Sequence, residues 1–232
     1  NLVIAQSVKW SASNLDDKIR IIHNEGGQTL GYSTASGIKI LTVDGLAFKD
    51  LNRNGKLDKY EDWRLPVDQR AKDLAAQMSI DQIAGLMLYS GHQSIPARPR
   101  GLGTGTYNGK LFDSSGAKAS DLSDQQIKFL TADNLRHVLV TTVASPEIAA
   151  IWSNNVQALV EGTGLGIPSN NSTDPRHNAI ANTEYNFGAG GRISMWPEAL
   201  GMAATFDPEL VKKFGSIASK EYRALGITTA LS

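Results

Sequence analysis

Residues 135–168, LRHVLVTTVASPEIAAIWSNNVQALVEGTGLGIP, decide the fold class of this chain. Leu135 to Val143 is a β-branched run of strand length. Residues 145–147, Ser-Pro-Glu, supply a serine cap, a first-turn proline and an acid that the helix dipole favours, so they predict the start of a helix. The predicted buried stripe of that helix is Ile148, Ile151, Trp152 and Leu159. Leu165 to Pro168 is predicted to be the next short strand.

The same alternation continues toward the carboxyl end. Residues 207–209, Asp-Pro-Glu, repeat the cap chemistry and open a helix that is apolar at Leu210, Val211, Phe214, Ile217 and Ala218. Gly226 stops that helix, and residues 227–231 begin a strand. Alternating strands and helices are typical of βα units around a parallel sheet. A closed barrel of eight units takes roughly 250 residues. The sequence therefore predicts an α/β fold that is the front part of a TIM-type (β/α)8 barrel in a larger protein.

Residues 1–49 are predicted to form a β-rich segment ahead of the barrel. Residues 18–22 and 38–43 are dense in isoleucine and valine, with the turn signal Asn-Glu-Gly-Gly at 24–27 between them. After Pro66, a helix is predicted with the apolar face Ala71, Leu74, Ala75 and Met78. A second helix has a capping box of Ser79 and Gln82 and the apolar face Ile80, Ile83, Ala84 and Met87.

Residues at about 90–125 interrupt this regularity with many glycines and serines and two prolines. The glycines at 103–109 lack the strand, the helix and the spacing of a dinucleotide-binding fingerprint. We therefore expect a mobile surface insertion. The predicted division is a β-rich segment at 1–49, a connector at 50–65 and the first part of the barrel at 66–232, with this insertion inside it.

The connector contains the stretch DLNRNGKLDKYE at residues 50–61, which matches a calcium-binding loop. Oxygen-bearing side chains fall at loop positions 1, 3, 5, 9 and 12, Gly55 lies at the sharp turn, and Lys56 would offer its backbone carbonyl. The predicted ligands are Asp50, Asn52, Asn54, Lys56, Asp58 and Glu61. The alternative is an Asn-Gly turn in a polar hairpin. A strand-like segment before the loop and Pro66 after it argue against the helix pair of a calcium sensor, so a structural Ca²⁺ is expected.

Composition narrows the function classes. Lysine plus arginine equals aspartate plus glutamate at 23 each, so no basic surplus favours a nucleic-acid partner. The chain has no cysteine, which excludes disulfides, thiolate catalysis and cysteine-ligated zinc. No apolar run approaches the ~20 residues needed to cross a bilayer. The chain begins with Asn1 rather than methionine, and a weak calcium loop fills most easily outside the cytosol, so a periplasmic or secreted location is expected.

The candidate chemistry lies in residues 169–178, directly after the strand predicted at 165–168. This loop places Asp174, Arg176 and His177 at a strand end, where βα folds carry their sites. A carboxylate there can accept hydrogen bonds from adjacent sugar hydroxyls, and the other two side chains could orient it or contact the same ligand. The alternative is that Asp174 only caps a helix, because the following proline repeats the Asp-Pro form seen at 207–208.

The other candidate side chains carry weaker signals. His23, His92 and His137 are expected to be structural or solvated, and the sequence has no histidine pair with metal-ligand spacing. Trp196 could stack on the apolar face of a sugar, but its apolar surroundings favour a place in the core.

Several passages resemble glycoside hydrolase family 3, the β-glucosidase family. They are FKDLNRNGKLDKYEDW at 48–63, MSIDQIAGLM at 78–87, GIP at 166–168 with STDPRH at 172–177, and MWPEALGMAATFD at 195–207 with EYRALGI at 221–227. The resemblance implies a retaining β-glycosidase in which the barrel is followed by an α/β sandwich domain. It further implies that Asp174 holds sugar hydroxyls in the subsite on the non-reducing side of the scissile bond, with His177 in the same loop. The chain departs from the family pattern at Asn178, where glycine is usual, and at Trp196, where phenylalanine is common.

In that family the nucleophile and the acid/base carboxylate come from later segments, so no catalytic residue is assigned to this chain and no cofactor is expected for catalysis. The implied partners are a β-glucoside or related oligosaccharide and the remainder of the same polypeptide. The competing hypothesis is a non-catalytic, calcium-stabilised carbohydrate-binding or scaffold module. A nucleotide-binding α/β protein fails for lack of a phosphate loop.

Overall fold

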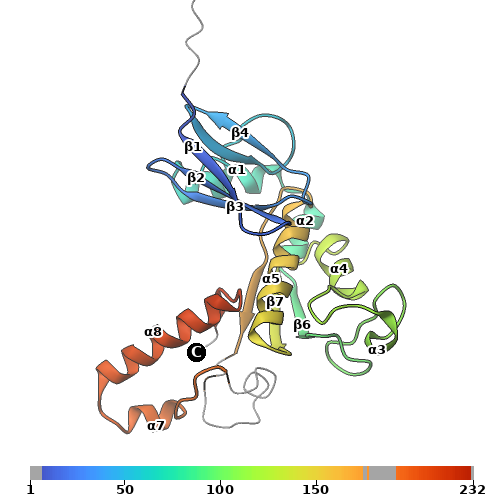
Figure 1. Ribbon diagram of the computed structural model, residues 1–232, viewed down its shortest axis with the longest axis vertical. Helices are drawn as coiled ribbons and strands as arrows, with labels where there is room; N and C mark the ends of the chain where they lie inside the picture. Colours follow the sequence, from blue (N-terminus) through green and yellow to red (C-terminus); the bar gives the residue numbers. More distant parts are fainter. Residues whose placement is uncertain (1–6, 175–176, 178–191, 231–232) are drawn as a thin grey trace, which may run out of the picture. The chain divides into compact units, whose positions relative to one another are not determined.

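The computed structural model describes residues 7–174, 177 and 192–230 (Figure 1). These residues fall into two compact units. The first unit is Asn1–Ile83 with Ala158–Pro168, and the second is Ala84–Gln157 with Ser169–Ser232. Both strands and helices are present, so the predicted mixed α/β class is confirmed.

The first unit begins with antiparallel strands, in agreement with the β-rich start that the sequence predicts. A three-stranded sheet has the order β1-β2-β3, and β4 pairs with β5 as a hairpin. The hairpin turns at Asp44 and Gly45, whose φ angles of 55° and 82° suit a two-residue turn. The strands are β1 (Trp10–Asn14), β2 (Ile19–Asn24), β3 (Thr29–Ser33), β4 (Lys39–Val43) and β5 (Leu46–Asp50).

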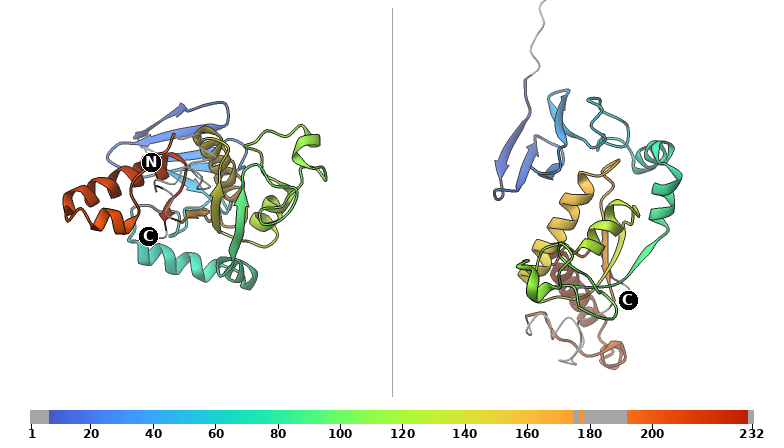
Figure 2. Two further views of the ribbon diagram at one scale, coloured as in Figure 1. Left: turned by 90° about the horizontal axis from the view of Figure 1, so that it is seen from below. Right: turned by 90° about the vertical axis from the view of Figure 1, so that its right-hand side faces the viewer.

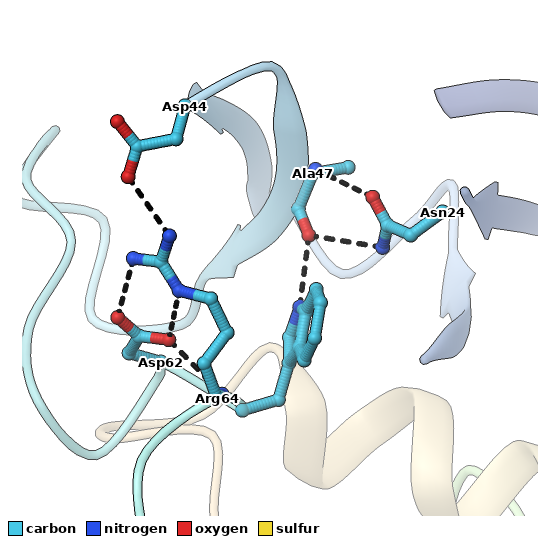
Figure 3. A network of polar contacts seen from close by, with 6 residues as sticks. Asn24, Asp44, Ala47, Asp62 and Arg64 are labelled. Atoms are coloured by element: carbon cyan, nitrogen blue, oxygen red, sulfur yellow. Dashed lines mark hydrogen bonds and ion pairs between the residues drawn. The ribbon is translucent and has the colours of Figure 1, made fainter. Parts of the chain in front are cut away.

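Strand β5 carries the buried centre of this unit. Phe48 is fully buried, and the ring of Trp63 stacks on it with centroids 5.2 Å apart. Figure 3 shows both backbone groups of Ala47 held by Asn24, at 2.7 Å for the N–H and 3.2 Å for the carbonyl. The same carbonyl accepts a hydrogen bond from the indole N–H of Trp63 at 3.0 Å. Arg64 lies over the Phe48 ring and forms ion pairs with residues 44 and 62, so polar contacts surround the apolar centre.

The carboxylate of Glu161, in the last turn of α5 (Pro146–Glu161), is anchored in the same unit. One oxygen accepts a hydrogen bond from the backbone N–H of Ser33 at 2.8 Å, and the other pairs with Lys49 Nζ at 2.7 Å. The residue is only 9% exposed. The negative end of the helix dipole disfavours an acid at this position, so these two partners offset that cost.

Helices α1 (Val67–Gln77) and α2 (Ile80–Leu86) follow Pro66 as predicted. The capping box of α2 is confirmed, because Gln82 N donates to Ser79 Oγ at 3.2 Å and Ser79 N donates to Gln82 Oε1 at 3.0 Å. The predicted apolar faces are not buried among the described residues. Helix α1 has no buried residue, and Ile80 and Met87 are 83% and 80% exposed.

The second unit is built on a parallel sheet with the order β6-β7-β8-β9. A parallel sheet with intervening helices is what the alternating sequence predicts. Figure 2 shows α7 and α8, coloured orange to red, as neighbouring helices in this unit. The strands are β6 (Tyr89–Ser94), β7 (His137–Thr142), β8 (Asn170–Thr173) and β9 (Thr229–Ala230). The helices besides α5 are α3 (Phe112–Ser115), α4 (Asp124–Thr131), α7 (Ala199–Ala203) and α8 (Pro208–Ala224).

The cap predictions for the two long helices hold. Ser145 Oγ accepts from Ile148 N at 3.2 Å, and Asp207 Oδ1 accepts from Glu209 N and Leu210 N at 3.0 and 3.1 Å. The predicted stripe of α5 is correct at Trp152, which is 1% exposed, but wrong at Ile151, which is half exposed. The buried face of α5 runs instead through Ala149, Trp152, Val156 and Val160.

The strand predicted at residues 165–168 is wrong. The observed strand β8 begins at Asn170, after Pro168, which has no N–H to donate, and Gly166, whose φ of 66° breaks an extended run. Polar residues can form a buried strand here because backbone carbonyls of the neighbouring strand accept hydrogen bonds from their hydroxyl groups. Thr173 Oγ1 donates to the carbonyl of Val140 at 2.8 Å.

The segment predicted as an irregular insertion differs in two ways from that description. Residues 89–94 form β6, so the irregular stretch begins only after Ser94. Beyond it, defined polar contacts hold the chain. The Tyr107 hydroxyl accepts from Ala97 N at 2.9 Å, and the Asp124 carboxylate accepts from Asn108 N and Gly109 N at 3.0 and 2.9 Å. These hydrogen bonds argue against the predicted mobility of the stretch, and hydrogen exchange would measure that mobility directly.

Candidate functional site

Asp174 lies at the carboxyl end of strand β8, whereas the sequence predicts it in a loop that follows a strand at residues 165–168. Strand β8 lies between β7 and β9, and Asp174 is the residue that directly follows it. Asp174 is half-buried, and its backbone carbonyl accepts a hydrogen bond from the hydroxyl of Tyr222 on α8 at 3.3 Å. The carboxylate therefore stands where βα folds present ligand-binding groups.

His177 is the second predicted residue of this loop, and it is buried. The residue is 4% exposed, and its ring meets the ring of Tyr222 edge-on with centroids 4.5 Å apart. Its Nε2 lies 2.7 Å from Glu221 Oε2. Burial lowers the pKa of His177 and the Glu221 carboxylate partly opposes that shift. Because a lowered pKa favours the neutral imidazole, we assign its proton to Nε2, from which it is donated to Glu221.

Glu221 binds a second segment of the chain as well. The same Oε2 accepts a hydrogen bond from Ser194 Oγ at 2.8 Å, and Ser194 N donates to Oε1 at 3.2 Å. Ser194 Oγ in turn accepts from the indole N–H of Trp196 at 3.0 Å, and Trp196 N donates to the carbonyl of His177 at 2.7 Å. One carboxylate on α8 therefore connects the Asp174–His177 loop with residues 194–196.

Trp196 packs against helix α8. It is half-buried, and its ring lies 5.4 Å from that of Phe214. This packing favours the core reading of Trp196 over sugar stacking, since the ring already has an aromatic neighbour. A groove of about 810 Å³ lies beside α8 and is lined mostly by apolar side chains, and His177 is also among its lining residues.

Of the remaining candidate residues, some lie outside the described part of the chain and the others make structural contacts. Arg176 lies outside the described residues, as do the residues that would show whether Asp174 caps a helix. The side chain of His92 is likewise outside the described part. His23 is exposed, with Thr29 Oγ1 at 3.5 Å from its Nδ1, and His137 Nδ1 lies 3.3 Å from Asn170 Nδ2. Both contacts suit structural roles.

Sequence reasoning missed Glu221 as a site residue. A signal for it was present, because Ala218 and Tyr222 form the buried face of α8 and Glu221 adjoins that face. An acid beside the apolar face of an amphipathic helix indicates a partner within the protein. The identity of that partner could not be read from the helix, because His177 is 44 residues away in sequence.

Some of the predicted calcium ligands form hydrogen bonds with one another. The side-chain nitrogens of Asn52 and Asn54 donate to Asp58 Oδ2 at 2.6 and 2.8 Å. Glu61 is 5% exposed, and its two oxygens accept from Leu51 N at 2.7 Å and Asp58 N at 3.0 Å. Within the described residues, no three acidic or histidine side chains form a group that could hold a metal ion by themselves.

Known proteins similar to this chain are glycosidases. The chain is 41% identical to the periplasmic β-glucosidase/β-xylosidase of Dickeya chrysanthemi over 198 residues, which is 84% of the chain and 28% of that protein. This chain is homologous to part of the family 3-type β-glucosidases. No protein-family model matches it.

Two fungal β-glucosidases are also similar to this chain. The chain is 34% identical to β-glucosidase C of Emericella nidulans over 86% of the chain and 30% of that protein. It is also 34% identical to the probable β-glucosidase C of Aspergillus oryzae over 77% of the chain and 26% of that protein. The chain thus spans less than a third of the length of the curated β-glucosidases it matches.

Among the described residues, no helix is both long and apolar enough to cross a membrane.

Proposed function

We propose that this chain is the amino-terminal part of a retaining β-glycosidase and forms the glycone-binding side of its site. The observation that carries the proposal is the place of Asp174, directly after a strand of a parallel sheet in a homologue of β-glucosidases. The strands β6 to β9 would be the first strands of the barrel. Residues 50–65 would connect the barrel to the β-rich segment.

In this proposal the Asp174 carboxylate accepts hydrogen bonds from two neighbouring hydroxyls of the terminal sugar. Such charge-assisted hydrogen bonds contribute roughly 1.5–3 kcal/mol each, and some strengthen in the transition state. His177 holds the loop from within, because its ring is buried and its Nε2 is bound to Glu221. Arg176 lies outside the described residues, and its contact with the same ligand stays a prediction from the sequence.

A retaining glycosidase needs two carboxyl groups roughly 5–5.5 Å apart. We assign neither of them to this chain, and expect both from later segments of the full-length polypeptide. The substrate would be a terminal β-linked glucoside or xyloside, since the names of the relatives include both activities. A periplasmic or secreted location is supported by the name of the Dickeya relative.

The test is hydrolysis of aryl β-glucoside and aryl β-xyloside by the full-length protein and its Asp174→Asn variant. We expect the substitution to lower kcat/KM by a hundredfold or more with the melting temperature unchanged, which corresponds to the loss of about two such hydrogen bonds.

Asp207→Asn is the matched control, because Asp207 caps α8 and has no expected ligand. It should lower stability slightly and leave kcat/KM intact. Equal losses of activity and stability in the two variants would show that Asp174 is only a cap. A full-length protein that binds β-glucosides without cleaving them would instead be the non-catalytic carbohydrate-binding module.

A further inference from the structure

The connector loop brings its oxygen-bearing side chains together. Asp50 ends β5, and its Oδ2 accepts a hydrogen bond from Gly55 N across the loop at 3.0 Å. Asn52 and Asn54 both reach Asp58 through their side-chain nitrogens. Loop geometry alone does not make a binding site, so an independent sign of a missing ligand is needed.

The Asp50 carboxylate supplies that sign. Asp50 is 0% exposed, and its Oδ1 has no hydrogen-bond partner. A buried carboxylate oxygen without a partner destabilises the fold, because it has lost its hydration and no hydrogen bond or counter-ion compensates for that loss. The other oxygen of the same carboxylate is fixed by Gly55 N, so the unpartnered oxygen is held inside the loop.

The donor set indicates which ion would fit. It combines carboxylates, side-chain amide oxygens and a backbone carbonyl, all of them hard oxygen ligands. The amide oxygens of Asn52 and Asn54 accept from Asn54 N and Lys56 N, and each retains a second lone pair. Three of the six proposed ligands are acidic, namely Asp50, Asp58 and Glu61, but among the described residues no three such side chains already stand close enough to hold a metal ion. Binding would therefore require the loop to draw these carboxylates together around the ion. A mixed, flexible oxygen set suits Ca²⁺ better than Mg²⁺, which demands near-octahedral geometry.

We propose that residues 50–61 bind a structural calcium ion, with Asp50 Oδ1 as a direct ligand beside Asn52, Asn54, Asp58, Glu61 and the carbonyl of Lys56. The ion would fix a junction within the first unit. Tyr60 N donates to Asp73 on α1 at 3.0 Å, and Arg53 donates to the carbonyl of Gly162 at 3.0 Å. The loop therefore links β5, α1 and the end of α5 whether or not the protein is a glycosidase.

The first measurement is calorimetric titration of the calcium-free, full-length protein with CaCl2. Wild type and Asp68→Asn should bind the same number of ions, because Asp68 is an exposed acid on α1 outside the loop. Asp50→Asn should bind one ion fewer. The proposal is overturned if wild type binds no calcium, or if Asp50→Asn binds as many ions with equal affinity.

The second measurement is the melting temperature in chelator and in CaCl2. In chelator, Asp50→Asn should melt no lower than wild type, because a buried amide costs less than a buried, unpartnered charge. Only wild type and Asp68→Asn should gain stability from CaCl2. If Asp50→Asn melts well below wild type in chelator, the Asp50 carboxylate stabilises the loop without an ion, which contradicts the role of its Oδ1 as a metal ligand. Asp58→Asn, at a half-buried position, repeats the test without altering the buried residue.

Discussion

At the scale of single residues, Glu221 determines how the Asp174–His177 loop is held. Its carboxylate binds the His177 ring and both polar groups of Ser194. The next residue, Tyr222, donates to the carbonyl of Asp174. Two consecutive residues of α8 thus hold both described ends of the candidate sugar-binding loop. If Asp174 binds the sugar, Glu221 is a positioning residue that never touches it.

We predict that Glu221→Ala in the full-length protein lowers kcat/KM at least tenfold. A hydrogen bond to a charged group is worth roughly 1.5–3 kcal/mol, and its loss frees the loop. The fall should appear mainly in kcat, because a displaced Asp174 loses contacts that strengthen in the transition state. Steady-state kinetics on an aryl β-glucoside gives the two parameters.

Glu209→Ala is the control, since it removes an exposed acid from the same helix. Glu221→Gln keeps a hydrogen-bond acceptor and should recover part of the lost activity. A Glu221→Ala variant that is less stable but has unchanged kcat and KM would contradict the positioning role.

The sequence predicts Asp174 in a polar loop after a strand, but the strand it names, at residues 165–168, is wrong. Part of that polar loop, Asn170–Thr173, is itself the strand β8 that Asp174 follows. The contact between His177 and Glu221 depends on how two distant segments pack, and no local pattern encodes that distance.

At the scale of elements, the caps were predictable and the strand β8 was not. A capping box such as Ser79 with Gln82 is decided within four residues, so its pattern and its structure coincide. Strand β8 is Asn-Asn-Ser-Thr, with Asn171 fully buried. Hydrophobic periodicity cannot find a strand whose side chains are satisfied by neighbouring backbones and side chains.

The stretch from 95 to 123 provides a prediction about an element. We expect Tyr107→Phe to destabilise this segment locally by about 1–3 kcal/mol, because Ala97 N would be left buried without its acceptor. Hydrogen exchange should show faster exchange around Ala97 in the variant. Tyr32→Phe, at a half-buried site in β3, should have no such effect. Exchange that is equally fast in wild type and variant would favour the mobile insertion that the sequence predicts.

At the scale of the whole molecule, the alternation of strands and helices in the sequence predicted the parallel sheet. The sequence could not show which apolar faces would be exposed to solvent. The face of α2 and the groove beside α8 are apolar and exposed among the described residues. Apolar periodicity marks a surface that packs against something without saying what packs there.

The stability of the folded protein should depend on pH through His177. Burial lowers the pKa of His177 in the folded state. Below about pH 6.5 the imidazole is therefore protonated in the unfolded chain while it is still largely neutral in the folded protein. The contribution of neutral His177 should be fully present above about pH 6.5 and be lost as the pH falls toward its lowered pKa. Glu221 is the charged group that acts on the ring, and it limits this loss.

Melting temperatures of the full-length protein at pH 5 and pH 7 check this prediction. His177→Gln should flatten the decline toward acid that wild type shows, whereas His23→Gln, which removes an exposed histidine, should not. Identical slopes for wild type and His177→Gln would contradict it.

The anchor of Glu161 makes the β-rich start hard to discard. A shortened variant that begins after residue 50 would lose both Ser33 and Lys49, the two partners of a carboxylate that is 9% exposed. What remains would be an acid at the disfavoured end of a helix, with no partner from the deleted strands. Loss or replacement of the first strands in evolution would therefore require a compensating change at position 161. An engineered protein without these strands should likewise carry Glu161→Gln.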